Sequence, residues 1–192
     1  MNASSSIDAA GTTQSAKKPF GTSAIADVII RSVDHTDFYV MQSLLRLVSP
    51  VFDTMISLPS LAEKNSGLTI VPIVTVEEDA MTLYNLLLLI YPYSQRPSFS
   101  VDICLKMAKA ARKYRMDDVE VRIRELAMAS SAMKREPLRI FAIALHLDWK
   151  DIMEAAARNT LAVPLRDLGW WEELEPEITK TCFGGGLGAK TP

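Results

Sequence analysis

The sequence predicts an α+β protein in which a small three-stranded sheet is capped by a cluster of helices, with a helical extension after it. Two kinds of hydrophobic pattern predict this class. β-Branched and aromatic residues run together at 26–31, 37–40 and 68–73, as they do in short strands. From residue 77 to about 161, apolar residues recur instead at the three- and four-residue spacing of helices.

The strands are expected as a hairpin followed by a separate edge. Residues 26–31 and 37–40 flank a polar stretch that suits a turn, so they predict a β-hairpin. The run at 68–73 contains Pro72, which has no N–H to donate to a neighbouring strand. We therefore expect this strand near its end or at the edge of the sheet, after a loop at 58–67.

Two short helices are predicted between the hairpin and that loop, over residues 41–48 and 50–57. Ser49 and Pro50 end the first helix, because the residue before a proline avoids helical geometry. Ser49 can then cap the second helix, in which Pro50 occupies the first turn.

The first of these helices carries apolar residues on more than one face. Leu44, Leu47 and Val48 share one face, and Met41 and Leu45 lie on another. A short helix with apolar residues to spare is expected to offer some of them to a partner, although all of them could lie in one core.

A helix that is apolar on all sides is predicted to begin near Glu77 and Glu78 and to end at Pro92, at the centre of its domain. Ser100 is the expected N-cap of a helix over 101–115. The helix after it opens on Asp117 and Glu120 in the manner of a capping box. Its inward-facing residues are expected to be Val119, Ile123, Leu126 and Ala127.

A second helical pair is predicted after Glu136 and Pro137, over 138–147 and 149–161. Its apolar register is expected at Leu138, Phe141, Leu145, Ile152 and Ala156. A short helix over 167–174 is expected next. Trp149, Trp170 and Trp171 are interpreted as anchors that hold this extension on the domain, with a pocket for a partner peptide as the alternative.

Composition bounds the class of protein. The 192 residues are 48% hydrophobic and 23% charged, which excludes a disordered chain. A net charge of −2 gives no general attraction to nucleic acid or to anionic membranes, and the apolar runs are too short to span a bilayer. Two cysteines, Cys104 and Cys182, suit a reducing compartment. We therefore expect an intracellular protein, cytoplasmic or nuclear.

Residues that carry chemistry are scattered, and we expect no catalytic site, cofactor, metal or small-molecule ligand. His35 falls in a turn, and His146 and Asp148 point to different sides of a helix. Cys104 fits an apolar helix face and Cys182 a loose tail. A cationic face is interpreted as solvated; it comprises Lys106, Lys109 and Lys113.

Several short motifs in this order resemble the BTB/POZ family. They are ADVII at 26–30, FYV at 38–40, LL at 44–45, SPVF at 49–52 and AxKYxM at 111–116. One departure is Met41, which stands where the family usually has a histidine. The helical pair after Glu136 is similar to the extension of fungal BTB-only proteins.

The resemblance implies a domain over residues 26–131 and a helical extension over 132–180. Residues 1–20 and 181–192 are expected to be flexible tails, since they hold few large apolar residues or are rich in glycine.

The family resemblance also implies a non-catalytic protein–protein interaction module that associates with itself or with another BTB protein. The family pairs through its N-terminal strand and first helix, which here implicates Ile25, Val28, Ile30, Met41 and Leu45.

The alternative that the resemblance implies is a substrate adaptor for a cullin-type ubiquitin ligase. In such adaptors an apolar residue, any residue and a glutamate precede the third strand, and Leu61 and Glu63 fit that pattern. An exposed loop is the plainer interpretation of these two residues.

Overall fold

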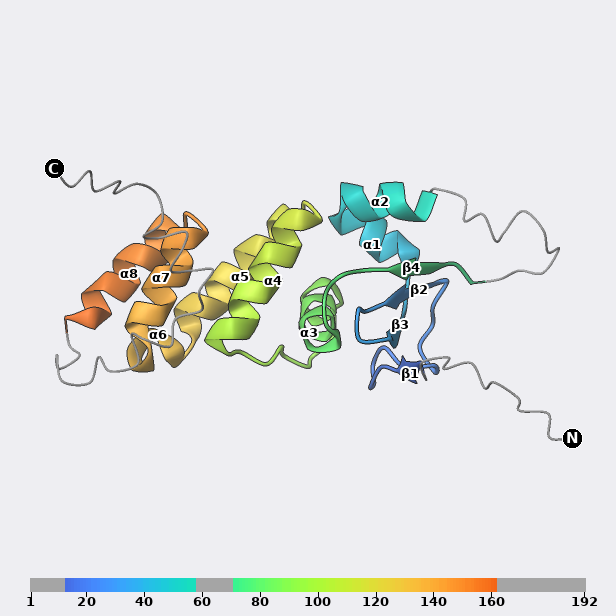
Figure 1. Cartoon of the computed structure of the whole chain (residues 1–192), viewed down its shortest axis with the longest axis horizontal. Coiled ribbons are helices and arrows are strands. Elements are labelled where there is room, and N and C mark those ends of the chain that lie inside the picture. Colours follow the sequence, from blue (N-terminus) through green and yellow to red (C-terminus); the bar gives the residue numbers. More distant parts are fainter. Residues whose placement is uncertain (1–12, 58–70, 162–192) are drawn as a thin grey trace, which may run out of the picture. The chain divides into compact units, whose positions relative to one another are not determined.

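The structure is a computed structural model that describes residues 13–57 and 71–161. Its residue contacts divide the chain into two compact units, Met1–Gln95 and Arg96–Pro192 (Figure 1). The described part of the first unit holds the sheet with three helices, and the elements of the described part of the second unit are all helices.

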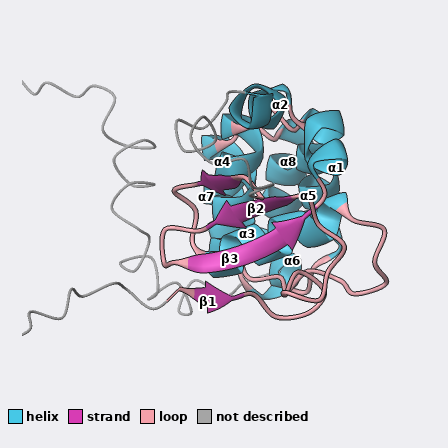
Figure 2. Ribbon diagram, turned by 90° about the vertical axis from the view of Figure 1, so that its right-hand side faces the viewer, coloured by secondary structure: helices cyan, strands magenta, loops and turns pink. Residues whose placement is uncertain are grey.

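The sheet has four strands in the order β1-β3-β2-β4 (Figure 2). The strands are β1 (Gln14–Ser15), β2 (Val28–Arg31), β3 (Thr36–Val40) and β4 (Ile73–Thr75). β2 and β3 pair antiparallel, with Ile30 opposite Phe38, which confirms the predicted hairpin. β1 pairs parallel to β3 and was not expected, so the predicted sheet was one strand short.

Residues 14–20 belong to the folded unit, although the sequence predicted a tail through residue 20. Phe20 is only 1% exposed. Its ring packs edge-on against three tyrosine rings, those of Tyr84, Tyr91 and Tyr93, at 5.2–5.8 Å between centroids. Gly21 follows where a Cβ atom would lie 2.9 Å from the carbonyl oxygen of Ala16. One large aromatic side chain therefore anchors a segment that is otherwise small and polar.

β4 is an edge strand, as Pro72 predicts. It pairs with β2 alone, and the carbonyl oxygen of Pro72 accepts a hydrogen bond from Ile29 N–H at 2.9 Å. The strand begins after the proline rather than before it. The predicted loop at 58–67 and the start of the predicted strand lie outside the described residues.

The two short helices are present as α1 (Gln42–Val48) and α2 (Pro50–Ser57). The hydroxyl oxygen of Ser49 accepts a hydrogen bond from Phe52 N–H at 3.0 Å, which confirms Ser49 as the cap of α2.

The central apolar helix is α3 (Ala80–Ile90). It begins three residues later than predicted, because Asp79 rather than the preceding acids caps it by accepting from Thr82 N–H at 2.7 Å. The carboxylate of Asp34 also accepts from Ala80 N–H at 3.0 Å. The buried residues of α3 cover most of the circumference of the helix, which confirms its predicted central place. They are Thr82, Leu83, Asn85, Leu86, Leu87, Leu88, Leu89 and Ile90.

The second unit is built from helical hairpins. Its helices are α4 (Val101–Lys113), α5 (Asp117–Ala129), α6 (Ala132–Arg135), α7 (Pro137–His146) and α8 (Lys150–Thr160). α4 packs on α5 and α7 on α8, as predicted (Figure 1). Ser100 caps α4 by accepting from Ile103 N–H at 3.2 Å, and Pro137 opens α7, both as expected.

Parts of the prediction for this unit were wrong. The short helix α6 was not expected. The buried side of α7 carries Ile140, Ile143 and Leu147, so Leu145 from the predicted register is exposed. Leu126 is only half-buried. Pro137 is buried as well and lies on the same side of α7 as Ile140 and Ile143. The buried side of α7 therefore differs from the predicted side that carries Leu145.

Candidate protein-interaction surface

Three of the predicted interface residues lie in the core of the first unit. Val28, Ile30 and Leu45 are fully buried. β2 also lies between β3 and β4, so both of its backbone edges are already paired. The folded unit presents neither these side chains nor the β2 backbone to a partner, which corrects the placement expected from the sequence.

The other two, Ile25 and Met41, are exposed, at 88% and 37%. The structure adds Leu47, which is 81% exposed although the sequence placed it on a different face from Met41. Met41, Leu44 and Leu47 are spaced three residues apart and follow one side of α1, and Leu44 is partly exposed. We call these three residues and Ile25 the α1 face.

Hydrogen bonds tie Asp27, two residues after Ile25, to the start of α1. Asp27 N–H donates to the carbonyl oxygen of Val40 at 3.1 Å, and the Asp27 carboxylate accepts from Gln42 N–H at 2.6 Å. These two bonds flank Met41, whose own N–H donates to the hydroxyl oxygen of Tyr91 at 2.6 Å. The residue directly before β2 and the first turn of α1 are therefore hydrogen-bonded to each other.

The hydroxyl of Tyr91 is hydrogen-bonded to the residue that precedes α1. Burial raises the pKa of this hydroxyl, which outweighs the opposite effect of the bond from Met41 N–H. The hydroxyl therefore stays neutral at physiological pH and keeps its place as the acceptor for α1.

Charges beside the α1 face are of both signs. Arg46 on α1 lies 3.6 Å from the carboxylate of Asp53 on α2, and both side chains are exposed. Such a pair adds little to stability but gives a contacting surface one cation and one anion. A second copy of the same surface can meet both charges with their opposites.

One sequence signal could have oriented α1 correctly. Leu45, Ser49 and Phe52 are buried, and they are spaced four and three residues apart across the break between the helices. Following this spacing through Ser49, instead of stopping at Pro50, places Leu45 inward and Leu47 outward. Leu61 and Glu63, the predicted cullin-contact residues, lie outside the described residues.

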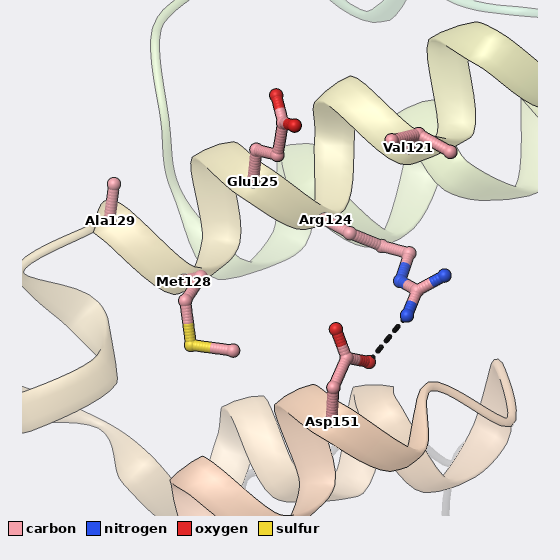
Figure 3. Close-up of a pocket in the computed structure, with 6 residues that line it drawn as sticks. All are labelled: Val121, Arg124, Glu125, Met128, Ala129 and Asp151. Atoms are coloured by element: carbon pink, nitrogen blue, oxygen red, sulfur yellow. Dashed lines mark hydrogen bonds and ion pairs between the residues drawn. The ribbon is translucent and has the colours of Figure 1, made fainter.

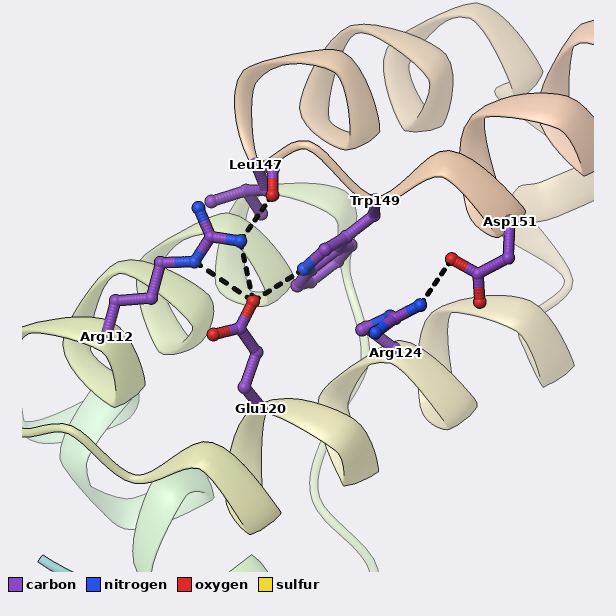
Figure 4. A network of polar contacts seen from close by, with 6 residues as sticks. All are labelled: Arg112, Glu120, Arg124, Leu147, Trp149 and Asp151. Atoms are coloured by element: carbon purple, nitrogen blue, oxygen red, sulfur yellow. Dashed lines mark hydrogen bonds and ion pairs between the residues drawn. The ribbon is translucent and has the colours of Figure 1, made fainter.

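The second unit is held by a polar network around Glu120 of α5 (Figure 4). One carboxylate oxygen, Oε1, accepts from the Arg112 guanidinium and from the Trp149 indole N–H, both at 2.7 Å. Arg112 also donates to the carbonyl oxygen of Leu147. α5 has no side-chain cap, so the capping box of Asp117 and Glu120 that the sequence predicted is absent.

A groove of about 480 Å³ lies between α5 and α8 in the same unit (Figure 3). Its lining residues are Val121, Arg124, Glu125, Met128, Ala129 and Asp151. Arg124 donates to Asp151 at 2.6 Å. Burial alone would raise the pKa of Asp151, but the hydrogen bond and charge of Arg124 outweigh it and hold the pKa low.

The candidate reactive side chains that the structure describes lie on separate elements. Cys104 is buried on α4, and burial raises the pKa of its thiol to about 12, so it packs as a small apolar residue. His35 lies in the β2–β3 turn with a positive φ of 58°, and His146 ends α7. Across residues 13–57 and 71–161, no group of His, Cys, Asp and Glu is arranged to hold a metal ion. Cys182 lies outside the described residues.

Comparison with known proteins identifies the family. A sequence model of the BTB/POZ domain matches residues 17–131, which is more than half of the chain. The chain belongs to the BTB/POZ family. Among solved structures, it is similar to the BTB domain of zebrafish PATZ1, with 17% sequence identity, coverage of 56% of this chain and 79% of that chain, and a TM-score of 0.40. No curated protein is similar enough to count as a relative.

BTB/POZ domains are protein–protein interaction modules, and the family is typically non-enzymatic. The match contains the whole α1 face. It ends at residue 131, so the likeness of the later helices to fungal BTB-only proteins stays a prediction. Within the described ranges, no helix is long and apolar enough to cross a membrane.

Proposed function

We propose that this protein is a non-catalytic BTB/POZ module that associates with a second copy of itself through the α1 face. The observation that carries the proposal is the exposure of Ile25 and Leu47, two large apolar side chains, on either side of the hydrogen-bonded start of α1 in the sequence. Isolated exposed apolar residues are common on proteins, but a group of them on an interaction domain favours an interface.

Burial of this face would favour association. Covering a side chain such as leucine contributes about 1.5–3 kcal/mol, and a symmetric dimer covers each residue twice. The exposed Arg46 and Asp53 beside the apolar residues fit the polar rim that surrounds such a centre. The scattered histidines and cysteines support a role without catalysis.

The test is the molar mass in solution, by sedimentation or light scattering, of the full chain and of Leu47→Glu. We expect a dimer mass for the wild type and a monomer mass for Leu47→Glu, because a carboxylate at that position would have to be buried against its symmetry mate. Val33→Glu is the matched control, since Val33 is 57% exposed in the same unit but lies in the β2–β3 turn.

Two results would contradict the proposal. One is a wild-type protein that stays monomeric at micromolar concentration. The other is a Leu47→Glu protein that keeps its dimer mass together with the Val33→Glu control.

A second proposed function is that of a cullin adaptor, supported by the sequence of Leu61 and Glu63 within the matched region. An apolar anchor beside a carboxylate can fill a pocket while the charge fixes orientation. A pull-down of a cullin N-terminal region with the wild type, Leu61→Ala and Glu63→Gln tests it. Equal capture by all three proteins, or no capture by any, would end this proposal.

A further inference from the structure

The outer side of α7 carries an apolar strip that the described helices of its unit leave partly exposed. Leu138, Phe141 and Leu145 are spaced three and four residues apart, so they lie on one side of α7, opposite the buried Ile140 and Ile143. Leu145 is 47% exposed, and the other two are partly exposed. We call these three residues the α7 strip.

The chain leaves α8 close to one end of this strip. α7 and α8 form an antiparallel hairpin with a short turn between them, so the end of α8 lies near the start of α7, where Leu138 is (Figure 1). Leu161, directly after α8, is 89% exposed. The chain then continues from residue 162 to residue 192.

The sequence that follows matches the strip in both pattern and charge. Four of the six large apolar residues at 165–178 recur at intervals of three, three and four: Leu168, Trp171, Leu174 and Ile178. Acidic residues lie beside and between these four: Asp167, Glu172, Glu173, Glu175 and Glu177. On the folded unit, the exposed cations Lys134 and Arg135 lie directly before α7, at the Leu138 end of the strip.

We propose that the α7 strip is the docking site of residues 165–178 of the same chain, which we call the acidic tryptophan segment. Its apolar residues cover the strip, and its carboxylates face Lys134 and Arg135. The strip is about 10 Å long at the rise of an α-helix. The residues between Leu161 and Trp171 span at most about 35 Å when extended, so the tether is long enough. A tether also gives the segment a high effective concentration at the strip.

Charge favours this site over the other apolar feature of the unit. The α5–α8 groove is lined by Glu125 and Asp151 against the single cation Arg124, so it repels an acidic segment. The α7 strip, by contrast, has the cations Lys134 and Arg135 at its Leu138 end, which is the end nearest to the C-terminus of α8. The inference is independent of the proposed self-association, because the α1 face lies in the first unit and plays no part in it.

Acrylamide quenching of tryptophan fluorescence in the full chain tests the docking. Trp149 is 2% exposed, so quenching reports mainly on Trp170 and Trp171. Leu145→Glu places a carboxylate on the strip, and we expect the ratio of docked to undocked chains to fall roughly tenfold, as the loss of one buried leucine implies. The quenching constant then rises and the emission shifts to longer wavelength.

Val121→Glu is the matched control, because Val121 is 49% exposed on the same unit but lies in the α5–α8 groove. We expect it to leave quenching unchanged. Reversal of the two cations, Lys134→Glu with Arg135→Glu, provides a second variant at exposed positions and should raise quenching with the apolar strip intact. Circular dichroism confirms that each variant is folded.

Three outcomes would overturn the proposal. The first is equal quenching of the wild type, Leu145→Glu and Val121→Glu. The second is an equal rise in both glutamate variants, which would assign the segment to no particular face. The third is protection that disappears on dilution of the wild type, which would make a second copy the occupant of the strip.

Discussion

The indole N–H of Trp149 donates to the Glu120 carboxylate across 2.7 Å, and this bond joins the two helical hairpins of the second unit. Glu120 belongs to α5, whereas Trp149 immediately precedes α8. Arg112 of α4 binds the same carboxylate oxygen (Figure 4). The sequence prediction that Trp149 anchors the C-terminal helices therefore holds for the described part of the extension.

Replacement of Trp149 by Phe should lower the free energy of unfolding of the second unit by about 1.5–3 kcal/mol. Phenylalanine keeps an aromatic ring at this position, but the half-buried carboxylate of Glu120 loses one of its charge-assisted hydrogen bonds. Urea unfolding followed by circular dichroism measures the change. Glu154→Gln breaks the highly exposed pair with Arg158 and should cost at most about 0.5 kcal/mol. Equal losses in the two variants would refute the anchoring role.

The stability of the second unit should depend on pH through Glu120. Burial alone would raise the pKa of this carboxyl, but the hydrogen bonds from Arg112 and Trp149 outweigh burial and hold it below its ordinary value of 4.5. The unfolded chain therefore binds this proton more readily than the folded protein does. The contribution is complete above about pH 4.5 and is lost as pH falls through the lower, folded-state pKa.

The measurement for this pH dependence is the unfolding midpoint between pH 7 and pH 3 for the wild type and Glu120→Gln. We expect the variant to be less stable at pH 7 and to lose less stability on acidification. Glu154→Gln shows how far removal of any one exposed carboxylate changes the profile. Parallel profiles for the wild type and Glu120→Gln would contradict the prediction.

Phe20→Ala should destabilise the first unit by about 3–5 kcal/mol, the usual cost of removing a buried aromatic ring. The ring contacts Phe38 and three tyrosines, so its loss leaves a cavity that rigid neighbours cannot fill. Thermal or urea unfolding measures the effect, and Phe20→Leu should recover part of it. A change of less than about 1 kcal/mol would show that residues 14–20 are not part of the folded unit.

Cys104 should resist alkylation in the native protein. Burial raises the pKa of its thiol to about 12, so at pH 8 it is neither ionised nor accessible. In a Cys182→Ser protein, mass spectrometry should find Cys104 unlabelled by iodoacetamide under native conditions and fully labelled in urea. Native labelling at the unfolded rate would contradict the burial of this residue.

Local sequence rules predicted most of the elements because their signals act over a few residues. Ser49 and Ser100 cap the helices they precede, and Pro72 marks the edge strand. β1 escaped prediction because it consists of two polar residues, Gln14 and Ser15, that gain their place through a tertiary contact of Phe20. The local sequence of β1 therefore carries no strand pattern, and the packing of Phe20 could not be predicted from it.

The candidate surface was harder to predict than the fold. Ile25 and Met41 are exposed as expected, but Leu45 and Leu47 exchange the places that the sequence assigned to them. Within one short helix, several apolar residues fit more than one face, and the core that decides between them includes α2 and α3. Glu120 was misassigned for a similar reason, since its partner Trp149 lies far along the chain.

The margins of the sheet have a consequence for how copies of this protein can meet. Within residues 13–57 and 71–161, both outermost strands are very short, and a proline stands just before one of them. Short edge strands of this kind give a foreign strand little free backbone to pair with. The proposed contact through the α1 face accordingly uses side chains, which can be selective where main-chain pairing is indiscriminate.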